Sequence, residues 1–422
     1  MKPARGGSPL PRVVATVSLL ALVALLGDHA AAQTLLQRPL PGTDVSVPGQ
    51  PELQPPRRAP ITLTPSIGAG VEYNDNVLLD NSAREWDVIG IFTPGLTFTA
   101  ERPTWRFNAG YYFENRVYWR EPERNNAFDR QVFTLDSFYR LAPNLTLSLD
   151  DEFSYERGLN AFRSRGIATG RDPSWTNTIR PGVTWQIDPL TTTRAFLGWT
   201  TWRFEGEDLS DSDSYHLDLA AERAFTPRLS GIAGYQAAYF DLDRGENATT
   251  HTPRIGARYD FTPTLTGTLT AGPTFVIQDS ETRVTPSVSA DLRKRYAWGT
   301  TTFTYMRDVG IASGLGGATD NQTIGLSVLV SRVWRGLTLD VTPQYTTAES
   351  DDDTIDVRAL TLPIQATYQF TPWFSATLGY AFFFQRDESR LRSATTGEPL
   401  ARDVDQNRVY FTLVFGYPIT FD

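Results

Sequence analysis

Apolar and polar side chains alternate along most of the chain, from residue 61 to the C-terminus. The stretch 337–346 (LTLDVTPQYT) is typical, with leucine, valine and tyrosine on one face and threonine, aspartate and glutamine on the other. Residues 145–155 and 374–385 follow the same rule. A period of two predicts β-strands, and helical spacing fits none of these stretches.

Eighteen such segments can be counted, most of them about 10–15 residues long. Strands of soluble proteins average about 5–6 residues, whereas a strand that crosses a bilayer needs about 9–11. The segment length therefore favours membrane-spanning strands. Sixteen strands is the alternative, because alternation is weak in the first pair, 61–73 and 88–100.

The connections alternate between short turns and long polar loops. The short turns recur about every 38 residues, near Pro103, Pro143, Pro189, Pro227, Pro263, Ala297, Arg335 and Pro372. The other connections are mostly longer: 156–174, 205–213, 241–249, 308–321, 347–355 and 386–404. Short periplasmic turns and longer extracellular loops are typical of outer-membrane barrels.

Aromatic residues cluster at both ends of the predicted strands. One set lies beside the turns (for example Trp105, Trp185, Trp298, Trp373) and another beside the loops (for example Tyr73, Tyr215, Tyr239, Tyr345). Two such belts fit the two membrane interfaces. Hydrocarbon offers no hydrogen bonds, so every backbone group must be paired, and closing the sheet achieves this. We therefore predict an all-β, transmembrane antiparallel up-and-down β-barrel over residues 61–422.

Two segments precede the predicted barrel. In residues 1–32, basic residues come before an apolar run at 13–26, and residues 30–32 are all alanine. These are the features of a secretory signal peptide, and the run is too short for a spanning helix. Residues 33–60 contain seven prolines and predict a Pro-rich periplasmic linker.

Composition narrows the function classes. The chain has no cysteine, which excludes disulfides and thiolate chemistry, and its net charge of −9 argues against nucleic acid as a partner. Ser214, His216 and Asp218 lie at alternate strand positions, about 6.5–7 Å apart at their Cα atoms, which is too far for a nucleophile to meet its base. The acidic stretches 205–213 and 349–353 lack the ligand spacing of a calcium loop. We expect no enzyme, no catalytic residue, no cofactor and no metal.

Charged residues of both signs fall on the polar face of the predicted strands. The candidate pore-lining residues are Arg106, Glu114, Arg116, Asp150, Glu152, Arg180, Asp218, Glu222, Arg254, Arg258, Asp291, Arg293 and Asp340. One hypothesis is a basic ladder of Arg180, Arg254, Arg258 and Arg293 that faces acidic strands and orients polar solutes. The alternative is a wall in which the two signs pair.

Aromatic side chains also fall on the polar face: Tyr112, Phe138, Trp202, Phe240 and Phe383. One hypothesis is a track on which sugar rings stack. The alternative is that these rings pack against loops.

The start of the predicted barrel carries a family resemblance. Residues 65–67 (PSI) and 71–77 (VEYNDNV), with later Gly-aromatic pairs such as Gly110-Tyr111 and Gly379-Tyr380, resemble the beta-barrel porin-2 family of bacterial outer-membrane proteins. The resemblance covers residues 61–422. Some members are encoded beside exopolysaccharide or capsule genes, so it implies envelope transport with a link to exopolysaccharide export. It carries no catalytic or binding residues to this chain.

The C-terminal strand at 408–417 (RVYFTLVFGY) looks like an assembly signal for outer-membrane insertion, although Pro418 and the terminal Asp422 depart from the usual aromatic ending. The expected partners are outer-membrane lipid and lipopolysaccharide, the barrel-assembly machinery, and polysaccharide or periplasmic export components.

The resulting prediction is a porin-like channel in the bacterial outer membrane for small hydrophilic solutes. A structural or adhesive barrel is the first alternative, with the pore occluded by loops 309–319 and 156–174. A secreted β-propeller is the second, but a blade needs four short strands per repeat, whereas two long ones are found here.

Overall fold

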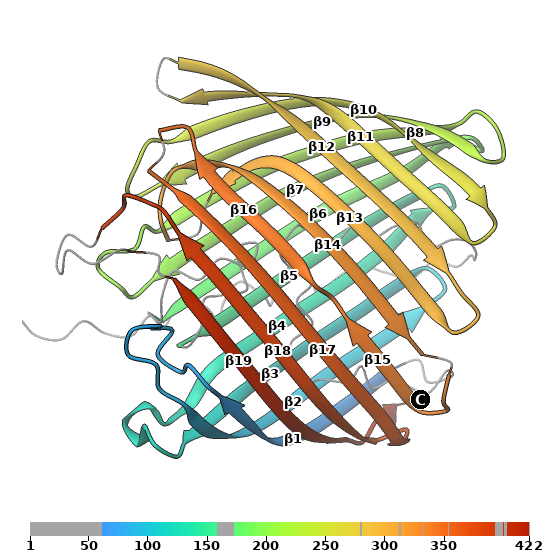
Figure 1. Cartoon of the computed structure of the whole chain (residues 1–422). Helices are drawn as coiled ribbons and strands as arrows, with labels where there is room; N and C mark the ends of the chain where they lie inside the picture. The colour runs from blue at the N-terminus through green and yellow to red at the C-terminus, as the bar shows by residue number, and fades with distance from the viewer. Residues whose placement is uncertain are drawn as a thin grey trace, which may run out of the picture.

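The computed structural model describes residues 61–421, apart from 158–172, 279–280, 312–313, 332, 353, 393–399 and 401–402. In this part of the chain one antiparallel sheet closes on itself into a barrel (Figure 1). The first strand, β1 (Ile61–Asn74), pairs with both β2 (Asp87–Arg102) and β19 (Val404–Gly416). Closure confirms the predicted all-β barrel and excludes a propeller, because strands β1 to β19 all have a paired neighbour on each side.

The other strands have the following bounds. They are β3 (Trp105–Tyr118), β4 (Asn126–Ala142), β5 (Leu145–Glu156), β6 (Ser174–Asp188), β7 (Thr191–Phe204), β8 (Ser212–Ala224), β9 (Leu229–Leu242), β10 (Ala248–Thr262), β11 (Leu265–Gln278), β12 (Glu281–Arg295), β13 (Gly299–Ile311), β14 (Ala318–Val330), β15 (Leu337–Val341), β16 (Gln344–Ser350), β17 (Asp356–Thr371), β18 (Phe374–Asp387) and β20 (Ile419–Phe421).

The 20 strands of this sheet form eighteen crossings of the wall. Strands β15 and β16 are two halves of one crossing interrupted at Pro343, because both pair with β14 and β17. Strands β19 and β20 are likewise two halves interrupted at Pro418, because both pair with β1. The first strand pair is fully formed, so the count is the predicted eighteen rather than sixteen.

Short turns close one end of the barrel at all the predicted positions. The tightest are 103–104, 143–144, 189–190, 263–264 and 372–373. The loop end carries the one helical turn of the described residues, η1 (Pro122–Arg124). No helix in this part of the chain is long and apolar enough to cross a membrane.

The outer face of the wall is apolar. Residues paired directly across two strands share a face, so the exposed Leu197, Leu269, Leu378 and Phe411 mark the outward set on their strands. Side chains at the intervening positions are largely threonine, serine and charged residues. This division produces the alternation seen in the sequence.

Prolines within the strands coincide with gaps in the hydrogen-bonded ladders. Pairing stops at Pro94 between β2 and β3, at Pro181 between β6 and β7, and at Pro273 between β10 and β11. Proline has no N–H to donate, which accounts for each gap. Pro286 lies opposite Pro273. The ladder between β12 and β13 covers only residues 288–295 of β12 and does not reach Pro286, so the loop ends of β12 and β13 separate.

The predicted signal peptide (1–32) and Pro-rich linker (33–60) lie outside the described residues, as does most of loop 156–174.

Candidate functional site on the inner wall and at the mouth

The candidate pore-lining residues all lie on the inner face of the wall. On β8, for example, Asp218 and Glu222 alternate with the exposed Tyr215 and Leu219. The same alternation holds on each strand that carries a candidate. That these residues line a pore stays a prediction.

Three of the four arginines of the proposed ladder are bound to carboxylates of the same region of wall. Arg180 Nη2 lies 2.8 Å from Asp150 Oδ2 on the neighbouring strand. Arg254 on β10 reaches over β9 to Asp218 Oδ2 at 2.9 Å, and Gly234 on β9 lies beneath its guanidinium. These bonds favour the paired wall over a basic ladder that faces acidic strands.

Glu222 is shared between two arginines. Arg258 Nη1 lies 2.8 Å from Glu222 Oε1, and Arg194 Nη2 lies 3.5 Å from Glu222 Oε2. These side chains are about a fifth exposed or less. The charges therefore lie in the surface of the wall, where two arginines and one carboxylate leave a net charge of +1.

Glu114 and Arg116 belong to a buried cluster on β3 and β4. Arg116 contacts Glu114 at 3.0 Å and Asp129 at 3.5 Å, while Arg130 contacts Glu114 at 3.4 Å. The guanidinium of Arg130 also lies over the ring of Tyr112. A carboxylate enclosed by two arginines is part of the wall, so this cluster contributes rigidity rather than free charge.

The remaining candidates are less enclosed. Arg106 bonds Asp136 and lies over the Phe138 ring, and Asp340 accepts a bond from Gln365 Nε2 at 3.4 Å. Glu152, Asp291 and Arg293 lie opposite threonines on both neighbouring strands, and Arg293 is exposed.

Three of the five inward aromatic rings are covered. Tyr112, Phe240 and Phe383 are 8%, 2% and 1% exposed. Leu79, from the loop between β1 and β2, packs in the same cluster as Phe383. A covered ring cannot stack on a sugar, so the hypothesis of a sugar track is wrong for these three residues. Phe383 packs against a loop residue, Phe240 packs against the ends of the β13–β14 hairpin, and Tyr112 lies against the guanidinium of Arg130.

The Gly-rich loop between β13 and β14 folds inward at the mouth. The ends of this hairpin pack with Phe240 and Ala248, which lie on the inner face of β9 and β10. Its tip reaches the loop between β7 and β8, where Ser210 N donates to Gly314 O at 2.9 Å. On the other side Leu315 packs against Ile355, in the turn between β16 and β17. The tip thus lies over the ends of β9 to β12.

This inward fold creates a contact that alternation did not predict. Strict alternation places Arg307 and Asp320 on the outer face, yet Arg307 Nη2 bonds Asp320 Oδ2 at 2.7 Å and Thr285 Oγ1, from the inner face of β12, donates to Asp320 at 2.9 Å. The hairpin has tilted into the bore, so its outer face meets the inner face of the wall. The signal in the sequence was Pro286, which ends the ladder between β12 and β13.

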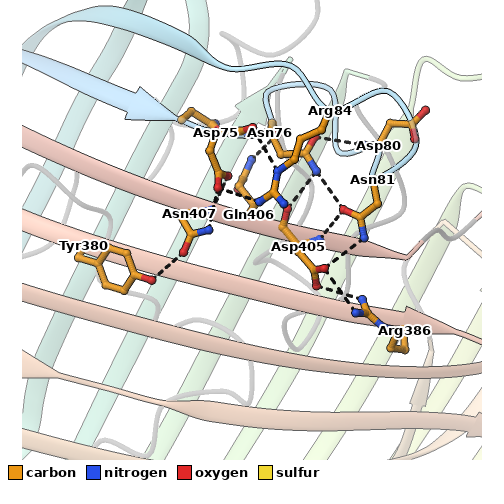
Figure 2. A network of polar contacts seen from close by, with 11 residues as sticks. Asp75, Asn76, Asp80, Asn81, Arg84, Tyr380, Arg386, Asp405, Gln406 and Asn407 are labelled. Carbon is orange, nitrogen blue, oxygen red and sulfur yellow. Dashed lines mark hydrogen bonds and ion pairs between the residues drawn. The ribbon is translucent and has the colours of Figure 1, made fainter.

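The loop after β1 fastens the first strand to the last (Figure 2). Asp75 accepts hydrogen bonds from the backbone N and from Nδ2 of Asn407, both at 2.7 Å. Asn76 donates to Asp405 O at 3.0 Å, and its own carbonyl accepts from Gln406 Nε2 at 2.8 Å. The stretch VEYNDNV therefore has a structural role: its Asp and Asn side chains hold the barrel shut at the mouth.

The contacts of Asp218 and His216 are with neighbouring wall residues. Asp218 is held by Arg254 and by Gln236 Nε2 at 2.7 Å, and the ring of His216 packs on Phe240. No group of three or more His, Asp or Glu residues in this part of the chain could hold a metal ion.

Comparison with solved structures finds outer-membrane barrels. Pseudomonas aeruginosa OpdQ is 11% identical, covers 85% of this chain and 98% of its own, and has a TM-score of 0.45. Pseudomonas aeruginosa OccK2 (OpdF), solved in complex with glucuronate, is 11% identical, with coverages of 86% and 98% and a TM-score of 0.45. The siderophore receptor PirA from the same species is 9% identical, with coverages of 84% and 80% and a TM-score of 0.42.

No curated protein matches this sequence. The family described as outer membrane protein G (OmpG) matches residues 75–301, which is more than half of the chain. The match starts at the loop that fastens the barrel and runs to the beginning of β13. The family match, the closed wall and its apolar outer and polar inner faces place the chain in the bacterial outer membrane as a porin-type barrel. The chain belongs to the outer membrane protein G (OmpG) porin family.

Proposed function

We propose that the protein is a non-enzymatic channel through which small hydrophilic solutes diffuse across the outer membrane. The observation that carries this proposal is the closed eighteen-strand wall with a hydroxyl-rich and charged inner face. At this strand number, side chains of the wall alone do not fill the interior, so water occupies the bore. The candidate pore-lining residues are proposed to border that water.

The pairing of charges supports broad rather than strongly ionic selectivity. Arg180, Arg254 and Arg258 each have a carboxylate partner within 3 Å, so their fields largely cancel a short distance into the bore. Neutral solutes such as sugars therefore fit this wall as well as ions do.

The inward hairpin supports a size limit at the extracellular mouth. Its tip is fixed on one side by Ser210 and on the other by Ile355, so it narrows the entrance above β9 to β12. The same hairpin also favours the second candidate, a structural or adhesive barrel whose pore is occluded. Conductance separates the two functions.

The test is conductance of the purified protein in planar bilayers, followed by uptake of a size series of neutral sugars into liposomes. A channel gives stable open steps and an uptake that falls steeply above one sugar size. A protein that is folded by heat-modifiable gel migration but gives neither steps nor uptake is not a channel, and the occluded barrel then replaces this proposal. Membership of the porin-2 family and a link to exopolysaccharide export stay predictions.

A further inference from the structure

A groove of about 480 Å³ lies on the outer face of the barrel between β6 and β10. It is apolar, with Leu197, Leu217 and Ala237 among its lining residues, and it runs from mid-height toward the loop end of these strands. A small side chain lies at its floor: Ala237 is opposite the larger Leu217 on one side and His251 on the other.

Three aromatic rings border the groove at its extracellular end. Trp199, Tyr215 and Tyr239 lie directly opposite one another on β7, β8 and β9. Their ring centroids are 6.3 and 6.2 Å apart, with interplanar angles of 2° and 23°. Each ring is more than 40% exposed. Together these three rings make a flat surface, which we call the aromatic shelf.

Polar groups accompany the shelf on the side away from the groove. Trp199 Nε1 donates to Asp213 Oδ1 at 3.2 Å, and Asn247 Nδ2 donates to the Tyr239 hydroxyl at 3.1 Å. Arg203 also bonds Asp213. The surface thus changes from hydrocarbon-like to aromatic to hydrogen-bonding over a few residues, which is the profile of an amphiphile with a polar head.

We propose that the groove and the aromatic shelf form a binding site for lipopolysaccharide of the outer leaflet, with one acyl chain in the groove and a sugar of the head on the shelf. The site lies on the lipid-facing side of the wall and in its extracellular half, where the outer leaflet is. Exposed tryptophan and tyrosine faces suit a sugar ring, because they offer an apolar plane beside hydrogen-bonding groups. A phospholipid has no ring to place there.

The shape of the site argues against a second copy of the chain. A stable protein interface buries about 1,200–2,000 Å² over a flat, complementary patch. Here the concave part is one narrow groove lined by a dozen residues on five strands. A single hydrocarbon chain fills such a groove, whereas a convex barrel wall does not.

The experiment uses the full processed protein, delipidated in detergent and incubated with rough lipopolysaccharide or with phosphatidylethanolamine, and native mass spectrometry reads bound lipid. We expect one lipopolysaccharide to be retained per barrel. Ala237→Phe fills the groove and should lower retention about tenfold, which corresponds to about 1.4 kcal/mol. The matched control is Ala271→Phe, an outward-facing alanine on β11 outside the groove, which should change nothing.

Trp199→Leu tests the sugar contact separately. It keeps the surface apolar but removes the largest of the three ring planes, so lipopolysaccharide retention should fall about threefold while phosphatidylethanolamine is unaffected. Heat-modifiable migration checks that each variant is folded. Equal retention of the two lipids by the unaltered protein, an equal loss with Ala271→Phe, or a dimer mass in place of bound lipid would each overturn the proposal. None of these readouts depends on conductance, so they are independent of the channel function.

Discussion

Removing the guanidinium of Arg254 should make the channel prefer cations. In the structure this group lies 2.9 Å from Asp218 Oδ2 and neutralises it. Arg254→Ser leaves the carboxylate charged, because Asp218 still accepts a hydrogen bond from Gln236 Nε2 at 2.7 Å. The variant therefore adds one fixed negative charge to the inner wall and keeps that charge in place.

The size of the effect follows from Coulomb's law. At about 10 Å from a unit charge in water, the interaction with an ion is about 0.4 kcal/mol. A cation gains this energy and an anion loses it, so their permeability ratio changes about fourfold before screening. At 0.1 M salt the Debye length is about 10 Å, so each energy falls to about 0.4 of its unscreened value and the expected change is about twofold.

Arg258→Ser provides the internal comparison. Its partner Glu222 keeps a second arginine, Arg194, at 3.5 Å. The carboxylate therefore remains neutralised, but the substitution still removes one positive charge from the wall, so the permeability ratio should shift toward cations by about the same amount as with Arg254→Ser. Similar shifts are expected because the net charge of the wall changes by the same amount in both variants.

The measurement is the reversal potential in a KCl gradient across a planar bilayer. Arg254→Ser combined with Asp218→Asn should return the ratio to that of the unaltered protein, since the added charge is removed again. An unchanged ratio for folded Arg254→Ser would refute the reasoning and with it the paired-wall picture of selectivity.

Three further changes test the mouth. Asp75→Ala removes both hydrogen bonds from Asn407 and should lower the free energy of unfolding by roughly 2–4 kcal/mol, read from urea unfolding on heat-modifiable gels. Gly316 has φ +71°, and an added Cβ would lie 2.7 Å from a backbone oxygen of a neighbouring loop. Gly316→Val should therefore displace the inward hairpin from the mouth and raise the single-channel conductance. Burial raises the pKa of Asp352, but hydrogen bonds within its turn outweigh this effect and hold the pKa below 3.8. The ionised carboxylate therefore stabilises the turn above pH 3.8, and this stabilisation is lost as the pH falls through the lowered pKa. The check is the protection factor of the Ile355 amide, that is, its exchange rate relative to an unprotected amide at the same pH. This protection should be lower below pH 3.8 than at pH 6.

Local pattern determined most of the architecture. Lipid requires one apolar face and complete backbone pairing, and both demands act on every strand separately. The alternation at 145–155 and 337–346 and the prolines at Pro103 and Pro372 therefore gave strand positions, turn positions and inner faces correctly. The strands β1 and β2 form despite weak alternation in their sequences. Backbone hydrogen bonds of β1 to both β2 and β19 stabilise it along its length.

What each inner side chain contacts was decided only by the tertiary structure. Arg254 meets Asp218 across an intervening strand, and Asp75 meets Asn407 from the other end of the chain. Such contacts depend on strand register and on closure, which a period of two does not encode.

The inward hairpin and the outer groove also have a tertiary cause. The β13–β14 hairpin leans into the bore because the ladder ends near Pro286 and Phe240 offers an apolar seat on the opposite inner face. The groove arises where Ala237 lies between the larger Leu217 and His251 of the neighbouring strands. Sequence alone set which face of each strand meets lipid, because that choice is made residue by residue. Packing between distant strands set where the wall is paired, narrowed or hollowed.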